Sequence, residues 1–360
     1  MKCKFGEIAT GFDYGMNAAA KPYDGQNKYI RITDIDEASS TYNNSSIVSP
    51  DGILSENYVV NEGDILLART GASTGKSYLY RKSDGKLYYA GFLIRANVAE
   101  HNPYFVFSQL HTHRYWRWVS IMSARSGQPG INSLEYASFP IFTTTLKEEN
   151  KISSLLSLID ERITTQNKII EDLKKLKSAI RKRIFTSLKN EHTENYEINQ
   201  LLAYEQPSAY IVANDEYSAD TTLTPVLTAN KGFVLGYTDE DFGIYQKGEC
   251  IIFDDFTMDA KYVSFPFKVK SSAIKILTAK LNVNLRFMFE YLSYLGLKSE
   301  EHKRHYISEI ASLVIELPSK EKQNRIANLM TSLDNKLALE EKVKAKYEDK
   351  KQYLLSQMFI

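Results

Sequence analysis

The sequence predicts two α/β (α+β) globular domains joined by two long antiparallel coiled-coil helices, arranged as a pseudo-twofold internal repeat. Three observations predict this class. Residues 147–188 contain no Pro or Gly, and their apolar residues recur at alternating steps of three and four, skipping only Gln166 and Lys177, the spacing of a helix that packs on a partner helix. A similar stretch occupies 319–360. An offset of 174 residues carries the first stretch onto the second.

The repeat is specific in residue identity. At the offset of 174, identical pairs include Asn150/Asn324, Ile152/Ile326, Leu155/Leu329, Asp160/Asp334, Lys168/Lys342 and Phe185/Phe359. A fixed offset over about fifty residues indicates an internal duplication. Each helix, at about 1.5 Å per residue, forms a rod of roughly 60 Å. One small domain cannot bury such a rod, so we expect the two rods to pair. The second rod is more polar along its seam, at Glu340, Lys344 and Lys351.

These observations divide the chain into four parts. We expect a first globular domain at 1–146, a first long helix at 147–190, a second globular domain at 191–318 and a second long helix at 319–360.

The first domain is predicted to mix strands and helices. Apolar runs between glycines predict strands at 29–33, 64–68, 77–80, 92–95 and 139–142. Asn102 and Pro103 are typical of an N-cap and a first helical residue, and predict a helix through about Val119.

The second domain follows the same plan. Residues 225–229 correspond to 29–33, residues 248–252 correspond to 63–67, and a helix over 284–297 corresponds to the one that begins after Pro103. A strand over 313–318 then leads to Ser319, the expected N-cap of the second rod. Because loop residues barely match between the halves, we expect two similar scaffolds with different ligands.

Composition is that of a globular protein with no metal centre. Among 360 residues, 25% are charged and 43% hydrophobic. Cys3 and Cys250 have neither a disulfide framework nor a zinc-ligand spacing. No stretch approaches membrane-spanning length, and we expect a cytoplasmic protein that does not bind a membrane.

Charge is unevenly distributed along the chain. Residues 147–190 carry 11 Lys and Arg against 6 Asp and Glu, a net +5, whereas 191–318 carry 11 against 19, a net −8. Nucleic-acid binding normally requires basic surface. A DNA-binding role for the second domain therefore requires its acidic residues to lie away from the binding face.

The segment 70–77, Thr-Gly-Ala-Ser-Thr-Gly-Lys-Ser, resembles a P-loop but differs from it in spacing. Only three residues separate Gly71 from Gly75, whereas the ATP-binding motif has four between its first Gly and the Gly-Lys pair. A predicted strand follows instead of a helix whose N-terminus could bind phosphate. We favour a glycine-rich hairpin that presents its side chains to a polyanion; a plain tight turn is the alternative.

No other pattern predicts catalysis. Asn102-Pro-Tyr-Phe105 resembles the flipped-base site of amino-methyltransferases, but a helix start explains the same residues. Asp254-Asp255 and Glu340-Glu341 lack the partners that acid–base chemistry requires. The aromatic segment 115–118 has a helical setting, which favours core packing.

The loop 126–133 is a candidate for reading bases. Its Gln128 and Asn132 are flanked by Gly, and such amides can bind adenine edges with two hydrogen bonds in the major groove. An ordinary hydrophilic loop is the alternative.

Several motifs together resemble the specificity (S) subunits of type I restriction–modification enzymes. They are Tyr-Ile-Arg-Ile-Thr-Asp at 29–34, the glycine-rich segment 62–76, Ser-Gly-Gln-Pro-Gly-Ile-Asn at 126–132, the segment 253–262 and Pro-Ser-Lys-Glu-Lys-Gln-Asn-Arg-Ile at 318–326. The resemblance covers essentially the whole chain, and the alternating order of globule and helix is its most specific part. The chain departs from the common Glu-Gln before each helix, with Glu148-Glu149 in one copy and Lys322-Gln323 in the other.

The resemblance implies a subunit that recognises DNA and performs no chemistry. Each globule would be a target recognition domain for one half of a split double-stranded DNA target, and the paired helices would fix the gap between half-sites. Methyltransferase (modification) subunits would dock on the chain, and a restriction motor–nuclease subunit would join the complex. S-adenosylmethionine, ATP and Mg²⁺ would belong to these partners, with no cofactor in this chain.

Candidate DNA-binding residues follow from the loops that carry the resemblance. In the first domain they are Arg31, Thr33, Arg69, Thr70, Gly71, Thr74, Lys76, Ser126, Gly127, Gln128 and Asn132. In the second they are Thr228, Asn230, Lys231, Thr257, Lys261, His305 and Tyr306.

Three other functions stay open at this point. One is the specificity subunit of another restriction class, with a fused methylase–nuclease as partner. Another is a coiled-coil scaffold with two protein-binding domains, which the −8 charge favours. The third is an NTPase at Gly71–Lys76.

Overall fold

The structure is a computed structural model, and it describes residues 1–37, 39–124, 127–189, 193–228, 232–280, 282–297 and 309–359. The chain forms two compact units. Unit 1 comprises Met1–Asn167 with Lys342–Ile360, and unit 2 comprises Lys168–Glu341. Each unit therefore combines one globule with a segment of helix α5 (Leu146–Leu188) and a segment of helix α8 (Lys320–Met358).

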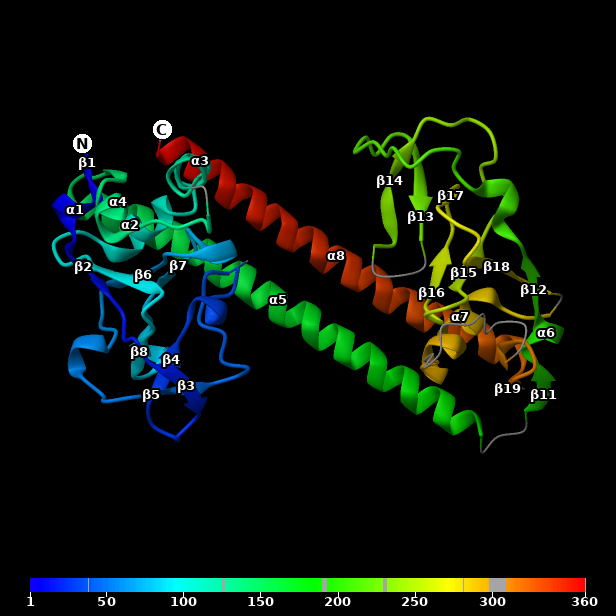
Figure 1. Cartoon of the computed structure of the whole chain (residues 1–360). Helices are drawn as coiled ribbons and strands as arrows, with labels where there is room; N and C mark the ends of the chain where they lie inside the picture. The colour runs from blue at the N-terminus through cyan, green and yellow to red at the C-terminus, as the bar shows by residue number, and fades with distance from the viewer. Residues whose placement is uncertain are drawn as a thin grey trace. The chain divides into compact units, whose positions relative to one another are not determined.

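The globule of unit 1 is an α/β fold (Figure 1). Its strands are β1 (Lys2–Lys4), β2 (Thr10–Tyr14), β3 (Ala19–Pro22), β4 (Lys28–Ile30), β5 (Val48–Asp51), β6 (Asp64–Ala68), β7 (Ser77–Leu79), β8 (Leu87–Tyr89), β9 (Leu93–Asn97) and β10 (Pro140–Phe142). Its α-helices are α1 (Phe5–Ile8), α2 (Pro103–Gln109), α3 (His113–Met122) and α4 (Ser133–Ala137). Its 3-10 turns are η1 (Ile32–Asp34), η2 (Glu56–Tyr58), η3 (Gly71–Ser73) and η4 (Lys82–Asp84).

The globule of unit 2 is built from a corresponding set of elements. Its strands are β11 (Glu194–Glu197), β12 (Leu202–Glu205), β13 (Thr224–Leu227), β14 (Val234–Thr238), β15 (Cys250–Asp254), β16 (Ala260–Val263), β17 (Lys268–Val269), β18 (Ile274–Ala279) and β19 (Val314–Leu317). Its helices are α6 (Ile198–Leu201), the 3-10 turn η5 (Pro207–Tyr210) and α7 (Leu285–Leu295).

The main sheets of the two globules have the same strand order, whereas the smaller sheets differ: unit 1 has the two-stranded sheets β3-β5 and β4-β8, and unit 2 has the three-stranded sheet β14-β13-β17. The main sheet of unit 1 has the order β2-β9-β6-β7, and that of unit 2 has the order β12-β18-β15-β16. Each unit also contains one parallel strand pair, β4 with β8 and β13 with β17. The antiparallel pairs β1/β10 and β11/β19 also correspond: Ile141 of β10 lies opposite Cys3, and Ile315 of β19, which is 174 residues further along the chain than Ile141, lies opposite Tyr196. The internal repeat predicted from the sequence is therefore present in the fold.

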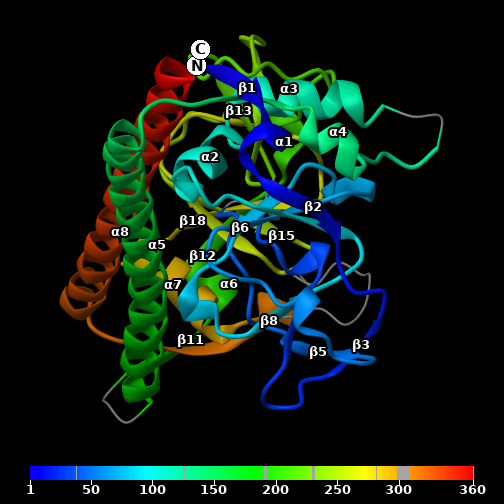
Figure 2. The ribbon, with the colours of Figure 1, turned by 90° about the vertical axis from the view of Figure 1, so that its left-hand side faces the viewer.

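Both long helices contribute to the core of each unit. In unit 1, Leu156 of α5, Leu355 of α8 and Phe359, which follows the end of α8, are buried in the same cluster as Ile65 and Ile94 of the sheet. In unit 2 the equivalent Phe185, with Leu188, packs in one cluster with Ile326 and Met330 of α8. In each unit the α5 and α8 segments run side by side in opposite directions (Figure 2). The fold class predicted from the sequence is confirmed.

Lysines on the helix seam form equivalent ion pairs in the two units. In unit 1, Lys351 Nζ of α8 lies 2.6 Å from a carboxylate oxygen of Asp160 on α5. In unit 2, Lys177 of α5 lies 2.5 Å from Asp334 of α8. Both partners in one pair are 174 residues from their counterparts in the other. The polar seam at Lys351 is thus part of the helix pairing within unit 1 and not a loose region.

The first turn of each long helix also caps a short helix of its unit. Asn102 and Asn284 are the N-caps of α2 and α7, and their side chains accept hydrogen bonds from the Phe105 and Phe287 amides. The backbone N–H of Asn102 donates to Glu149 Oε2 at 2.9 Å, and that of Asn284 donates to Gln323 Oε1 at 2.9 Å. Glu149 and Gln323 are both buried. The Glu149 carboxylate and the Gln323 amide oxygen therefore accept the same hydrogen bond in the two copies. This equivalence explains why Glu149 can stand where the second copy has Gln323.

Two elements of unit 1 differ from the expected ones. The helix predicted through Val119 breaks after Gln109, because Thr112 becomes the N-cap of α3 and accepts a hydrogen bond from the Tyr115 amide. The strand predicted over 29–33 ends at Ile30, since Asp34 accepts hydrogen bonds from the backbone and guanidinium of Arg31 and closes the turn η1. A local hydrogen bond by a short polar side chain overrides the apolar pattern in both cases.

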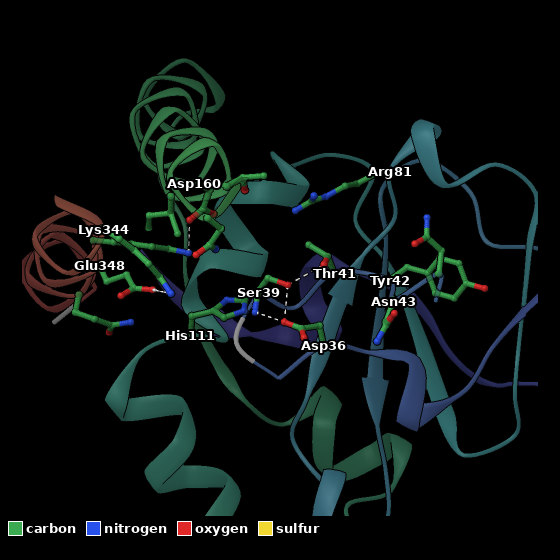
Figure 3. A pocket seen from close by; sticks show the side chains of 16 residues that line it. Asp36, Ser39, Thr41, Tyr42, Asn43, Arg81, His111, Asp160, Lys344 and Glu348 are labelled. Atoms are coloured by element: carbon green, nitrogen blue, oxygen red, sulfur yellow. Dashed lines mark hydrogen bonds and ion pairs between the residues drawn. The ribbon is translucent and has the colours of Figure 1, made fainter. Parts of the chain in front are cut away.

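Unit 1 also contains a polar cleft of about 710 Å³. Figure 3 shows Asp36, Ser39 and Thr41 on one side of it, with Asp160 of α5 and Lys344 and Glu348 of α8 on the other. His111 lies at its base, where Nδ1 donates to the Phe107 carbonyl and Nε2 accepts from the Ser40 hydroxyl, both at 3.0 Å. Desolvation, with a smaller effect from Lys351, lowers the pKa of His111 to about 4. The ring therefore ties the loop around Ser40 to α2 in its neutral form.

We expect Glu149→Ala to destabilise unit 1. It leaves the half-buried N–H of Asn102 and the half-buried ring of His101 without their fully buried acceptor, and each buried unsatisfied donor costs about 1–3 kcal/mol. We expect a loss of about 2–4 kcal/mol in the free energy of unfolding, measured by urea titration. The control is Glu148→Ala, whose half-exposed carboxylate pairs with Lys151 on the surface and should cost about 0–1 kcal/mol. Equal losses for the two variants would contradict the capping role.

The stability of unit 1 should depend on pH through His111. Its pKa is about 4 in the fold and about 6.5 in an unfolded chain, so the unfolded state binds the proton first as pH falls. This contribution to stability is fully present above about pH 6.5 and is lost as pH falls towards about 4. The free energy of unfolding should therefore fall less between pH 7 and 5 in His111→Gln than in the wild type. His113→Gln, at an exposed ring, should behave like the wild type; identical slopes in all three proteins would refute the expectation.

Candidate nucleic-acid interface

The segment 69–76 is a rigid hairpin loop between β6 and β7. Two buried tyrosines hold its backbone: Tyr115 donates to the Gly75 carbonyl at 2.8 Å, and Tyr136 donates to the Ala68 carbonyl at 2.7 Å and accepts from the Gly75 amide. Gly71 and Gly75 have φ values of +68° and +92°, which favour glycine. At Gly75 a Cβ atom would also lie 2.7 Å from Val119 of α3. The loop leads into strand β7 and not into a helix, so it lacks the helix N-terminus of a P-loop.

A second loop, residues 127–132, lies beside this hairpin. The Gly71 amide donates to the Pro129 carbonyl and the Ile131 amide to the Arg69 carbonyl, each at 2.9 Å. The two loops enclose a small hollow of about 160 Å³, lined by Arg69, Thr70, Gln128, Pro129, Gly130, Ile131 and Asn132. Two segments expected to bind DNA, far apart in the sequence, therefore meet at one place in unit 1.

Arg69 is positioned by a residue that sequence reasoning missed. Its guanidinium lies over the ring of Tyr14, 4.6 Å from the ring centroid. Tyr14 is the last residue of β2, and its hydroxyl accepts a hydrogen bond from the Ser133 amide at 3.2 Å. Hydrogen bonding with Ser133, through its side chain first and its amide second, lowers the pKa of Tyr14, and the charge of Arg69 adds a smaller effect in the same direction. The only signal in the sequence was an aromatic residue at a strand end, which does not identify its partner.

The amides of the second loop differ in what they can offer a ligand. Gln128 is exposed, and its Nε2 approaches Gly71 so closely that a Cβ there would lie 3.0 Å away. Asn132 is the N-cap of α4, where its Oδ1 accepts from the Glu135 amide and the Glu135 carboxylate accepts from the Asn132 amide. The sequence Asn-x-x-Glu is a capping-box signature, and α4 was missed because these residues were interpreted as loop. Gly127 is exposed beside Gln128.

Several other candidates have intramolecular partners. Thr74 is buried and its hydroxyl donates to the Gly71 carbonyl, which corrects the expectation that it faces DNA. Lys76 lies 3.1 Å from Glu37. Arg31 forms a two-point ion pair with Asp34, so its guanidinium is committed to η1. Thr33 is exposed and Thr70 is half-buried.

In unit 2 the hairpin β15/β16 occupies the place of β6/β7 but has different chemistry. Asp254 accepts hydrogen bonds from the Phe256 and Thr257 amides and so closes the turn. Asp255 is buried beside Lys275, 3.5 Å away. Thr257 is exposed and Lys261 half-buried. Thr228 is half-buried, and its amide donates to the Phe233 carbonyl.

Five predicted residues lie outside the described residues: Ser126, Asn230, Lys231, His305 and Tyr306. Among the residues that the structure does describe, no group of His, Cys, Asp and Glu could hold a metal ion. Within the same ranges, none of the helices has the length and apolar character needed to cross a membrane.

Comparison with protein families gives one consistent result. Residues 186–348 match the model of the type I restriction modification DNA specificity domain. The chain is 43% identical over 127 residues to the EcoR124I/EcoR124II specificity subunit of Escherichia coli, a match that spans 34% of this chain and 31% of that protein. It is 24% identical over 328 residues to the putative MjaX specificity subunit of Methanocaldococcus jannaschii, covering 82% of this chain and 77% of that protein.

Solved structures with a similar fold come from the same kind of protein. The S subunit of a type I restriction–modification system from M. genitalium superposes with a TM-score of 0.68 at 15% identity, covering 100% of this chain and 96% of that one. A chain from a structural study of complex assembly in the type I system superposes with a TM-score of 0.56 at 13% identity, over 99% and 96% of the two chains. The duplicated topology, the helix pairing within each unit and these matches agree: the chain is similar in sequence and fold to type I restriction–modification specificity subunits, and its residues 186–348 match the model of their DNA specificity domain.

Proposed function

We propose that this chain is the DNA-recognition subunit of a type I restriction–modification complex and has no catalytic activity of its own. Unit 1 and unit 2 would each read one half of a split target on double-stranded DNA. The observation that carries the proposal is the repeat: the main sheets have the same strand order, whereas their equivalent hairpins, β6/β7 and β15/β16, differ in sequence and chemistry. Two domains with the same main-sheet order and different hairpin loops suit the recognition of two different DNA sequences.

The long helices would act as the spacer between the half-sites. Helix α5 is continuous over 43 residues and α8 over 39, roughly 60 Å of helix each. Half-sites read from one face of a duplex lie about 34 Å apart, one turn of DNA. The ion pairs Lys351–Asp160 and Lys177–Asp334 support a fixed register between the helices within each unit.

The same helices offer a surface to methyltransferase subunits. Leu155 and Leu329 are equivalent in the repeat, and each is more than 40% exposed. Leu158, Leu176 and Leu339 are exposed on these helices as well. Exposed apolar residues that recur on long helices indicate an interaction surface. A repeated surface would suit two copies of a modification subunit, with the restriction motor–nuclease subunit joining the assembly.

The chemistry of the complex would then belong to the partners. The methyl donor S-adenosylmethionine would bind the modification subunits, and ATP with Mg²⁺ the restriction subunit. The proposal puts this subunit in the cytoplasm, with the DNA. The −8 charge of residues 191–318 favours the other candidate function, a protein-binding scaffold, which predicts no salt-sensitive DNA binding by the assembled complex.

Methylome sequencing tests the proposed function directly. The chain is expressed with its methyltransferase subunit in a host that lacks other modification systems. We expect methylation at one bipartite motif with a fixed gap, and none when this chain is omitted. A host genome without any bipartite methylated motif would refute the proposal.

Lengthening the helices should lengthen the gap. Four residues inserted at Gln166 of α5, with a matched insertion at the equivalent Glu340 of α8, add about 6 Å of helix, or about one to two base pairs. The methylated half-sites should stay unchanged while the gap grows. The control is a four-residue insertion at Gly25, where the surroundings are open; it should leave the gap as it is. An unaltered gap in the helix variants would refute the spacer role.

A further inference from the structure

Arg69 and Tyr14 form a stacked pair at the edge of the hollow in unit 1. Arg69 follows the last residue of β6, and its guanidinium lies 4.6 Å from the centroid of the Tyr14 ring. Tyr14 is 41% exposed, so the pair faces solvent and is not part of the core. The Ser133 amide fixes the tyrosine hydroxyl at 3.2 Å. The ring is thus held at both ends, by its strand and by the start of α4.

The stack leaves the hydrogen-bonding edge of Arg69 available. Its guanidinium makes no hydrogen bond or ion pair with any residue in the described part of the chain. Other arginines of unit 1 are committed: Arg31 to Asp34, Arg95 to Asp13 and Arg114 to the Pro140 carbonyl. An arginine held by its flat face keeps its five N–H donors for a ligand in the plane of the group.

The hollow beside Arg69 is lined by polar side chains, and backbone hydrogen bonds between the two loops set its shape. The hollow of about 160 Å³ beside it is lined by Thr70, Gln128 and Asn132, with Gly130 and Pro129 between them. Because Gly71 has no side chain, the exposed side-chain amide of Gln128 can lie directly against it. The backbone bonds between the two loops are 2.9 Å long, so the hollow is preformed and does not need a ligand to assemble it.

A planar pair of donors with a fixed orientation suits a guanine better than a phosphate. The O6 and N7 acceptors of guanine lie side by side on the major-groove edge, and bidentate arginine is the commonest way to read them. An arginine fork can also bind a phosphate, but the side-chain amide of Gln128 lines the same hollow as Arg69, and such amides read base edges. We propose that Arg69 reads a guanine in the half-site recognised by unit 1, and that Tyr14 is the residue that positions it. This inference rests on the proposed function and adds the identity of one base.

The test compares methylomes of the intact complex carrying single substitutions in this chain. The wild-type motif should contain a guanine at one fixed position of one half-site. Arg69→Ala should make that position degenerate, with a loss of discrimination of about tenfold to a hundredfold, and should leave the gap and the other half-site unchanged. Tyr14→Ala should relax the same position, whereas Tyr14→Phe keeps the ring face and should retain the motif.

Matched controls separate a base contact from a general loss of binding or folding. Arg81→Ala removes an exposed arginine elsewhere in unit 1 and should keep the motif. Melting temperatures of the purified complexes should agree across the set. Binding to oligonucleotide duplexes at several salt concentrations gives the second readout, because a lost phosphate contact weakens all sequences equally and reduces the salt slope by about one.

Two outcomes would overturn the proposal. In one, the Arg69→Ala complex keeps the wild-type methylation motif but binds every duplex more weakly, which would make Arg69 a phosphate contact. The other is a relaxed position that is not guanine in the wild type. An unchanged motif in Tyr14→Ala beside a relaxed one in Arg69→Ala would remove Tyr14 as the positioning residue. A wild-type complex without any bipartite motif would instead refute the proposed function itself.

Discussion

The structure depends on the hydrogen bonds that the long helices accept at the N-termini of the short helices α2 and α7. The first N–H groups of an α-helix have no partner within that helix, and in both units the long helix supplies one. Glu149 receives the Asn102 amide in unit 1, and Gln323 receives the Asn284 amide in unit 2. The neighbouring Asn150 and Asn324 accept from the side chains of the same two caps. Each long helix is therefore anchored to its globule by directed hydrogen bonds as well as by apolar packing.

The sequence predicted the long helices and the internal repeat best, because both extend over many residues. The two rods and the offset of 174 could be predicted because every turn of helix repeats the same requirement for an apolar stripe. The strands β6 and β15 lie close to their predicted places, since continuous apolar runs between glycines have few other interpretations. The correspondence between the halves also extends to the parallel pairs β4/β8 and β13/β17.

What could not be predicted depends on contacts between distant residues. The stacking of Arg69 on Tyr14 joins two residues that are 55 positions apart in the sequence, and nothing local to either residue indicates the other. The break between α2 and α3 was locally encoded by Thr112, yet the apolar pattern around it favoured a single helix. Short strands such as β1 and β11 exist only because β10 and β19 pair with them. Of the expected DNA contacts, the structure brings Arg69, Thr70, Gln128 and Asn132 to one hollow.

The way in which the hairpin of unit 1 is held determines which of its residues can be substituted during evolution. Its shape is held by main-chain groups: the carbonyls of Ala68 and Gly75 accept from buried tyrosines, and the Pro129 carbonyl accepts from Gly71. Thr74 is buried and its hydroxyl donates to the Gly71 carbonyl, but among the described residues the side chains of Arg69 and Thr70 make no hydrogen bond that holds the hairpin. Substitutions at Arg69 and Thr70, or at Gln128 of the neighbouring loop, can therefore accumulate without refolding the hairpin, and under the proposed function such point mutations would give new target sequences while the glycines and tyrosines beneath are retained for folding.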